Sequence, residues 1–256
     1  MKGKVMCSVA VMVAEVVLLL VSNPVQASTL DDLIRTSAEN SYVFTTYLQG
    51  DDINIQSEDG VVFLTGTVSE ESHRALAQET VAALPGVISV DNRLEVKGGQ
   101  PPEKSDASLS EKVKTTLLLH QNVGAVSEVS TREGIVTLHG KATSLAQKDL
   151  TTEYVRDVGG VKDVRNEMTV SDTGGKTTRT IVEKIDDASI TAQVNMALMF
   201  HRSTSFLHTT VTTKHGVVTV GGKAKNEAEI DLVSKLVTDI KGVKSISNQM
   251  TVEKSR

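Results

Sequence analysis

The sequence predicts an α+β protein made of three tandem small αββαβ modules, each a three-stranded sheet with two helices on one face. Three observations support this fold class. A glycine-bounded segment of alternating apolar residues occurs three times, another glycine follows the first one after 26 residues, and an asparagine stands six residues later. Identical spacing in three places identifies an internal repeat. The segments are Gly60 to Gly66, Gly134 to Gly140 and Gly216 to Gly222, the later glycines are Gly86, Gly160 and Gly242, and the asparagines are Asn92, Asn166 and Asn248.

Each glycine-bounded segment has the two-residue period of a half-buried strand. Val62 and Leu64 alternate with Phe63 and Thr65, so one face is apolar. A turn dipeptide precedes the strand, which predicts a hairpin with an earlier strand. The turn dipeptides are Asp59-Gly60, Glu133-Gly134 and His215-Gly216, and the earlier strands centre on Ile55, Val129 and Val211.

A helix and a last strand should complete each unit. Ser144 with Gln147 and Asn226 with Glu229 have capping-box spacing at two helix starts. The next glycine is suited to end the helix. The expected helical stripes are Leu76, Val81 and Leu84, then Leu150, Tyr154 and Val158, then Leu232, Leu236 and Ile240, and the last strands end at Val96, Val170 and Val252.

An opening helix is expected before each hairpin. In the second unit it begins at Ser108 with Glu111 as capping partner. The third unit has the clearest buried stripe, whereas Ser and Thr crowd the first. The stripes are Ile34, Ala38 and Tyr42, then Leu109, Val113 and Leu117, then Ile190, Val194 and Leu198.

Polar segments rich in Gly, Pro or Thr separate the repeats and define the expected boundaries. The predicted organisation is a leader at 1–27, module 1 at 28–97 with a divergent first helix, a linker at 98–107, module 2 at 108–170, a linker at 171–185, module 3 at 186–252 and a tail at 253–256.

The first 27 residues have the pattern of an export signal. Lys2 and Lys4 precede a mostly apolar run, and small residues at Val25 and Ala27 suit a signal peptidase. This pattern predicts a periplasmic protein, and Glu15 within the run leaves an uncleaved anchor as the alternative. The only cysteine, Cys7, lies in the leader, so the mature chain is expected to have no disulfide.

Three motifs together resemble the BON domain (bacterial OsmY and nodulation). In the third repeat these are the segments Asp187 to Val194, Gly216 to Gly222 and Lys241 to Asn248, and in the second Asp106 to Val113 with Gly134 to Gly140. The first repeat matches in its second half. The resemblance implies a cell-envelope protein active under osmotic stress that binds phospholipid surfaces or envelope partners.

Catalytic and metal-binding patterns are not found in the sequence, which predicts a non-enzymatic protein without a cofactor. His201, His208 and His215 are seven residues apart, which is not a metal-ligand spacing. No phosphate-binding glycine motif opens a helix, so the repeat glycines are interpreted as turns and helix stops. His120 and His201 share one place at the end of an opening helix, where core stacking or the helix dipole accounts for them.

Charge separates the three modules. Module 1 has four basic and twelve acidic side chains, module 2 has eight of each, and residues 187–252 of module 3 have seven basic and five acidic. The whole chain has a formal charge of −5, which disfavours nucleic-acid binding. If one module approaches an anionic lipid surface, module 3 is favoured.

Apolar residues off the buried stripes are the candidate contacts with lipid or a partner, together with two lysines. Packing between modules is the alternative for these residues, favoured in module 2. A scaffold or chaperone-like module that docks on outer-membrane or secretion proteins is the rival function, and a sensor of a small ion or small ligand is a third. The candidates are Met196, Met199, Phe200, Lys223, Lys225, Leu118, Leu119 and Phe63.

Overall fold

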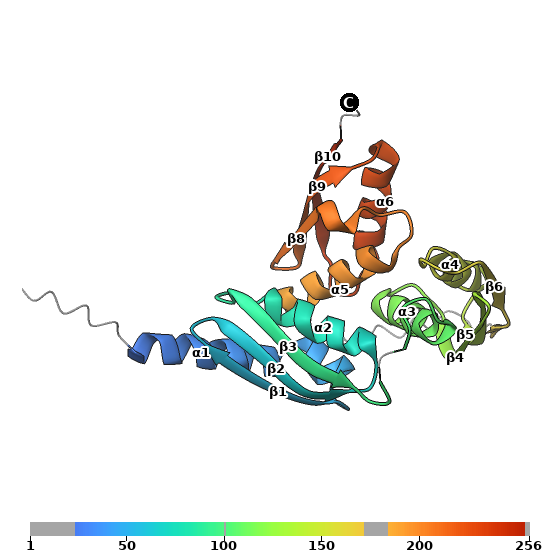
Figure 1. The fold of residues 1–256 in the computed structure, drawn as a ribbon. Helices are drawn as coiled ribbons and strands as arrows, with labels where there is room; N and C mark the ends of the chain where they lie inside the picture. Colours follow the sequence, from blue (N-terminus) through green and yellow to red (C-terminus); the bar gives the residue numbers. More distant parts are fainter. Residues whose placement is uncertain (1–23, 100, 172–183, 254–256) are drawn as a thin grey trace, which may run out of the picture.

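The computed structural model describes residues 24–99, 101–171 and 184–253, so most of the predicted leader and part of the second linker lie outside the described residues. Three separate sheets confirm the three-module fold (Figure 1). Module 1 contains α1 (Pro24–Glu39), the π-helix η1 (Val43–Tyr47), β1 (Asp52–Glu58), β2 (Val61–Val68), α2 (Glu71–Ala82) and β3 (Ser89–Val96). Module 2 contains α3 (Asp106–Leu119), β4 (Ala125–Arg132), β5 (Ile135–Ala142), α4 (Leu145–Arg156), β6 (Asp163–Asn166) and β7 (Thr169–Val170). Module 3 contains α5 (Asp187–Phe200), the 3₁₀ turn η2 (Phe206–His208), β8 (Thr209–Lys214), β9 (Val217–Ala224), α6 (Glu227–Thr238) and β10 (Ser245–Val252).

All three sheets have the same topology. The middle strand pairs antiparallel with the strand before it and parallel with the strand that follows the second helix. Antiparallel neighbours can be joined by a short turn, whereas parallel neighbours need a crossover. The helices α2, α4 and α6 provide that crossover in their modules.

The predicted hairpin turns are confirmed, and each is held by an aspartate from the opening helix. Asp59, Glu133 and His215 have φ of 50°, 54° and 54°, and the glycine after each also has positive φ. Two successive positive φ angles define the type I′ turn that suits a β-hairpin. The N–H groups of each turn donate to one carboxylate, those of Asp31, Asp106 and Asp187 respectively.

Glycine is required where two strands of a hairpin come closest. A Cβ on Gly222 would lie 1.9 Å from the carbonyl oxygen of His208, and the φ of Gly222 is +122°. The equivalent Gly66 and Gly140 would place a Cβ 2.0 and 2.2 Å from a backbone oxygen. These three glycines lie within strands, so the interpretation of the repeat glycines as turns and helix stops does not hold for them, and the close backbone approach is what requires glycine here.

Two opening helices have other bounds than the sequence suggested. Helix α3 begins inside the predicted linker, because the hydroxyl of Ser105, not Ser108, accepts the N-cap hydrogen bond. Glu111 is therefore in the middle of the helix and has no capping role there. Helix α1 ends at Glu39, so Tyr42 lies beyond it and only Ile34 and Ala38 of that stripe are buried by the helix.

The buried face of α4 is displaced from the predicted stripe. Leu150 is 37% exposed, whereas Thr151 and Val155 are fully buried. The capping box is as predicted, with the N–H of Gln147 donating to the Ser144 hydroxyl at 3.1 Å. The buried Thr151 hydroxyl accepts from the N–H of Gly124, so a polar contact takes the place that sequence reasoning gave to leucine.

The modules do not pack in chain order. Modules 1 and 3 share one continuous hydrophobic core, in which α2 contacts α5 (Figure 1) and which Leu119 of module 2 joins, whereas the other buried apolar residues of module 2 form a core of their own. Within residues 24–99, 101–171 and 184–253, no helix has the length and apolar character to cross a bilayer.

Candidate interaction surfaces

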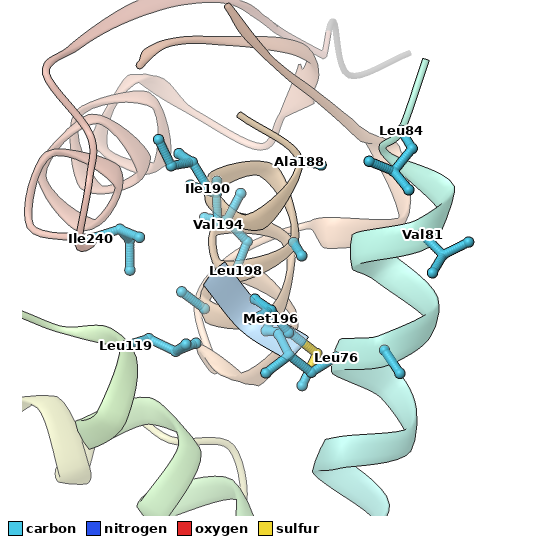
Figure 2. Close-up of a cluster of buried hydrophobic side chains, with 14 of the residues drawn as sticks. Leu76, Val81, Leu84, Leu119, Ala188, Ile190, Val194, Met196, Leu198 and Ile240 are labelled. Carbon is cyan, nitrogen blue, oxygen red and sulfur yellow. The ribbon is translucent and has the colours of Figure 1, made fainter. Parts of the chain in front are cut away.

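Helix α5 forms the contact between modules 1 and 3, and this contact buries two of the predicted surface residues. Met196 is 0% exposed and Phe200 is 9% exposed, and Figure 2 shows Met196 beside Leu76 of α2. Both side chains are buried in this arrangement, which agrees with the alternative of packing between modules and leaves them unavailable to lipid here. A sequence signal existed, because α5 is apolar on almost every face, and such a helix is usually enclosed.

Polar groups fix the register of this contact. The Ser189 hydroxyl and the Asp186 carboxylate of module 3 accept hydrogen bonds from the N–H groups of Val43 and Tyr42, at 3.1 and 2.8 Å. The N–H groups come from the interrupted end of the opening helix in module 1. The irregular segment that blurred the first repeat is therefore part of the interface.

Modules 2 and 3 meet through a reciprocal contact in which equivalent atoms exchange hydrogen bonds. The N–H of Lys241 donates to the carbonyl of Leu119, and in the mirrored position the N–H of Gly159 donates to Phe200, at 3.2 and 2.9 Å. A second pair runs from Gln121 to Asp239 and from Arg202 to Asp157, again between backbone groups. Leu119 is 0% exposed here, so it is not available to lipid, which agrees with the alternative of module packing.

The two repeat histidines lie inside this reciprocal contact. His120 stacks on Tyr154 with ring centroids 3.9 Å apart, and its Nδ1 lies 3.2 Å from Asp239. The Tyr154 hydroxyl donates to the same carboxylate at 2.6 Å. Burial opposes ionisation of Asp239, but His120, Tyr154 and Asn122 outweigh it and lower its pKa. Stacking, one of the two explanations from sequence, applies to His120.

Four of the predicted candidates remain at the surface. Met199 and Leu118 are 41% and 39% exposed, and Lys223 and Lys225 are exposed. Phe63 is half-buried, and the guanidinium of Arg93 lies 5.8 Å from its ring centroid. Sequence reasoning gave no means to group the four surface residues.

The largest apolar exposure on module 3 is Leu207, at 90%. It belongs to the turn η2, and Phe206 of the same turn packs against the core. The turn contacts β9, and Lys225 follows that strand directly. We call Leu207, Lys223 and Lys225 the Leu207 patch. Sequence reasoning missed Leu207 because the turn before β8 has no counterpart in the other repeats.

Glu229 holds the Leu207 patch together. Its carboxylate accepts from the N–H of Ser205 at 2.5 Å and from the N–H of Lys225 at 2.7 Å, so the turn and the end of β9 share one anchor. Burial opposes its ionisation, but these N–H donors outweigh burial, and the pKa of Glu229 is lowered. The residue is 4% exposed.

Leu118 lies at a different surface, a groove of about 370 Å³ between α3 and the edge strand β4. Val126 and Val129 line the groove, and Lys114 and Lys241 stand at its rim. Among the described residues, no group of three or more His, Cys, Asp or Glu side chains is arranged to hold a metal ion. The Leu207 patch and the groove beside Leu118 both combine apolar side chains with lysines, a composition that suits binding of an amphipathic or anionic partner.

Comparison with known proteins identifies the repeat. The BON domain profile matches residues 30–98, 105–172 and 186–254. The chain is 27% identical over 143 residues to osmotically-inducible protein Y of Escherichia coli strain K12, covering 54% of this chain and 71% of that protein. It is 29% identical over 154 residues to an uncharacterized protein of the gshII 5′ region in Anaplasma centrale, covering 59% of this chain and 97% of that protein.

Two solved structures of CdsD, described as a structural protein of the type III secretion system of Chlamydia trachomatis, also match. They cover 88% and 83% of this chain and 93% and 96% of their own, with identities of 18% and 16% and TM-scores of 0.22 and 0.21. Scores this low give no support for a common arrangement of modules.

Proposed function

Because the chain belongs to the BON domain family, we propose that it is an exported, non-enzymatic protein of the periplasm that acts in the cell envelope during osmotic stress. The similarity to an osmotically inducible protein supports this assignment. We propose further that module 3 binds anionic phospholipid surfaces through the Leu207 patch. The observation that carries this proposal is a 90% exposed leucine in a turn that contacts β9, the strand that contains Lys223 and is followed by Lys225, both exposed lysines.

Both parts of the patch are needed for membrane affinity. Burying a leucine side chain contributes about 1.5–3 kcal/mol, and each lysine near an anionic surface contributes about 1 kcal/mol. The sum is about 3.5–5 kcal/mol, which corresponds to a dissociation constant near the millimolar range. Binding should therefore be reversible and should weaken as salt screens the lysines.

Vesicle flotation tests the proposal with the chain from residue 28 onward. Vesicles that contain phosphatidylglycerol should carry the protein at low salt, whereas phosphatidylcholine vesicles should not. Leu207→Glu should abolish flotation, and Lys223→Glu with Lys225→Glu should do the same. Glu227, two residues after Lys225, is exposed, so Glu227→Gln should strengthen binding.

The chain provides matched controls in module 2. Leu145 is 69% exposed, and Lys141 holds the repeat position of Lys223. Leu145→Glu and Lys141→Glu should float like the unmodified chain. Equal losses in the control and test variants, or no flotation at low salt, would exclude the Leu207 patch as a lipid site.

The rival function, docking of an envelope protein, has one observation in its favour. The groove beside Leu118 lies along β4, an edge strand whose outer backbone groups could pair with an added strand. Binding to envelope extracts that survives Leu207→Glu and is lost in Val126→Pro would favour this second function, because proline removes a backbone donor.

A further inference from the structure

The reciprocal contact between modules 2 and 3 contains a histidine whose polar atom is left without a partner. The Nδ1 of His201 accepts a hydrogen bond from the N–H of Ser203 at 3.1 Å, so the ring proton of the neutral form belongs to Nε2. That Nε2 is buried, has no hydrogen-bond partner and lies 3.7 Å from the Asp157 carboxylate. The side chain of His201 is only 7% exposed.

His120, at the equivalent position, has partners that His201 lacks. His120 has a stacked tyrosine and a carboxylate of lowered pKa that binds three donors. In module 3, the repeat position of Tyr154 is Leu236, which offers neither stacking of rings nor a hydroxyl. The two halves of the contact therefore share a backbone pattern but differ in how they would accept a proton.

The groups around His201 oppose a second positive charge. Arg202 follows it in the chain, and its guanidinium donates to the carbonyls of Arg156, Val158 and Val161 at the end of α4. The small cavity beside the ring is lined by His120, Tyr154 and Asp157, together with Thr116, Val158, Ala197 and Leu236. Asp157 is the one acid at this cavity and is 45% exposed, so water weakens its field. Just after the end of α6, Asp239 lies against His120 and the Lys241 ammonium donates to the carbonyl of Leu118, on the His120 side of the contact.

Burial, Arg202 and His120 lower the pKa of His201, and Asp157 offsets only part of this. Because the pKa of His201 is lowered in the closed contact, the ring binds a proton more tightly in the open state than in the closed state. The contact is therefore unaffected well above pH 6.5 and becomes weaker as pH falls below that value.

We propose that the contact between modules 2 and 3 is an acid-sensitive joint, which opens when His201 is protonated and exposes Leu119 and Ile240. Both are 0% exposed in the closed joint, and each belongs to a different module. The joint would act as a sensor of acid outside the inner membrane.

Module 2 keeps a separate attachment to module 1 when the joint opens. Glu111 of α3 accepts a hydrogen bond from the backbone of Glu71, and Lys114 lies 3.5 Å from Glu70. Burial and the nearby Glu70 raise the pKa of Glu111, so acid favours this attachment. Acid should therefore turn module 2 away from module 3 without releasing it from module 1.

Energy transfer between dyes on modules 2 and 3 tests the joint in the full chain. The variant combines Cys7→Ser, which removes the native thiol, with Ser127→Cys and Lys235→Cys, which introduce one thiol in module 2 and one in module 3 at exposed positions. Transfer should fall between pH 7.5 and 5.5 with a midpoint below 6.5. For one proton, the ratio of open to closed molecules changes by at most about tenfold per pH unit. A second pair, Glu58→Cys with Lys225→Cys, reports on modules 1 and 3 and should remain unchanged.

Substitutions distinguish His201 from the other titrating groups. His201→Asn should abolish the pH response, whereas His208→Asn, at an exposed histidine, should retain it. Asp157→Asn removes the compensating charge and should move the midpoint upward. If His201→Asn is already open at pH 7.5, the shift in Asp157→Asn decides the question. The proposal would be overturned if the distance between the dyes is unchanged at pH 5.5, or if the midpoint does not move in Asp157→Asn. It would also be overturned if His201→Asn is closed at pH 7.5 and still opens in acid like the unmodified chain.

Discussion

Exchanging the acid and the amide at one repeat position should destabilise both modules that contain it. Glu229 of module 3 and Gln147 of module 2 each occupy the third position of the capping box. The neighbouring loop presents the N–H of Ser205 to Glu229, but presents the carbonyl of Val123 to Gln147. A carboxylate suits the first loop and an amide suits the second, because only the amide has a donor.

The cost follows from the bond that each substitution removes. In Glu229→Gln, one of the two part-buried N–H groups, from Ser205 or Lys225, faces an amide nitrogen and loses its acceptor. In Gln147→Glu, the 3.2 Å bond to Val123 is replaced by two facing oxygens. An unsatisfied buried polar group costs about 1–3 kcal/mol, so each substitution should lower the stability of its loop by about that amount.

Amide hydrogen exchange measures this cost locally. The Ser205 and Lys225 amides should exchange roughly 5- to 150-fold faster in Glu229→Gln, since about 1.4 kcal/mol corresponds to a tenfold change. Glu227→Gln, at an exposed acid on the same helix, should leave both rates unaltered. If both variants behave alike, hydrogen bonding by the buried carboxylate does not hold the loop.

The same residue should contribute to acid lability. Burial opposes its ionisation but the donors outweigh it, so the folded pKa of Glu229 is below 4.5. Its stabilising contribution is therefore complete above pH 4.5 and is lost as pH falls toward the folded pKa. Glu229→Gln should have a shallower loss of module 3 stability below pH 4.5, and an unchanged slope would contradict the assigned hydrogen bonds.

Three other substitutions test the repeat and the shared core. Gly222→Ala should prevent module 3 from folding, because its Cβ would lie 1.9 Å from the His208 oxygen. Circular dichroism and soluble yield measure this loss. In the control Gly98→Ala, the added Cβ meets nothing within 4 Å, so this variant should fold. Leu198→Ala, at a site 1% exposed, should cost about 2–5 kcal/mol in denaturant unfolding, and modules 1 and 3 should lose stability together if their core is shared. Asp187→Ala should cost about 1–3 kcal/mol by leaving the turn N–H groups of His215 and Gly216 without their acceptor, and a melting temperature equal to that of the unmodified chain would refute this role.

Turns and strands could be predicted because their causes are local. Asp59-Gly60 predicts a hairpin, since the two positive φ angles of the turn suit this dipeptide. The α4 stripe was displaced because the Thr151 hydroxyl, not an apolar side chain, occupies the inner position. Helical periodicity cannot identify a buried threonine whose partner lies in a loop 27 residues away.

The surfaces could be predicted only in part, because exposure depends on contacts between modules. Met196 and Met199 are three residues apart, yet Met196 lies beside Leu76 of α2 and is buried, whereas Met199 is 41% exposed. The turn that carries the exposed Leu207 is anchored by a hydrogen bond from the N–H of Ser205 to Glu229, a contact between segments separated by 24 residues. Neither the packing of α2 on α5 nor that contact has a periodic signature.

Differences between equivalent positions explain why module 2 forms the reciprocal contact with module 3 and a different contact with module 1. Modules 2 and 3 each have a histidine 14 residues after the turn-binding aspartate and an aspartate three residues before the later glycine. Module 1 has Thr45 and Ala83 at these places, and its opening helix is interrupted before Thr45. Without the histidine, the acid and a continuous helix end, module 1 lacks the groups for a reciprocal contact. It packs instead through α2 against the apolar α5, so one repeated fold produces two unlike interfaces from a few substitutions.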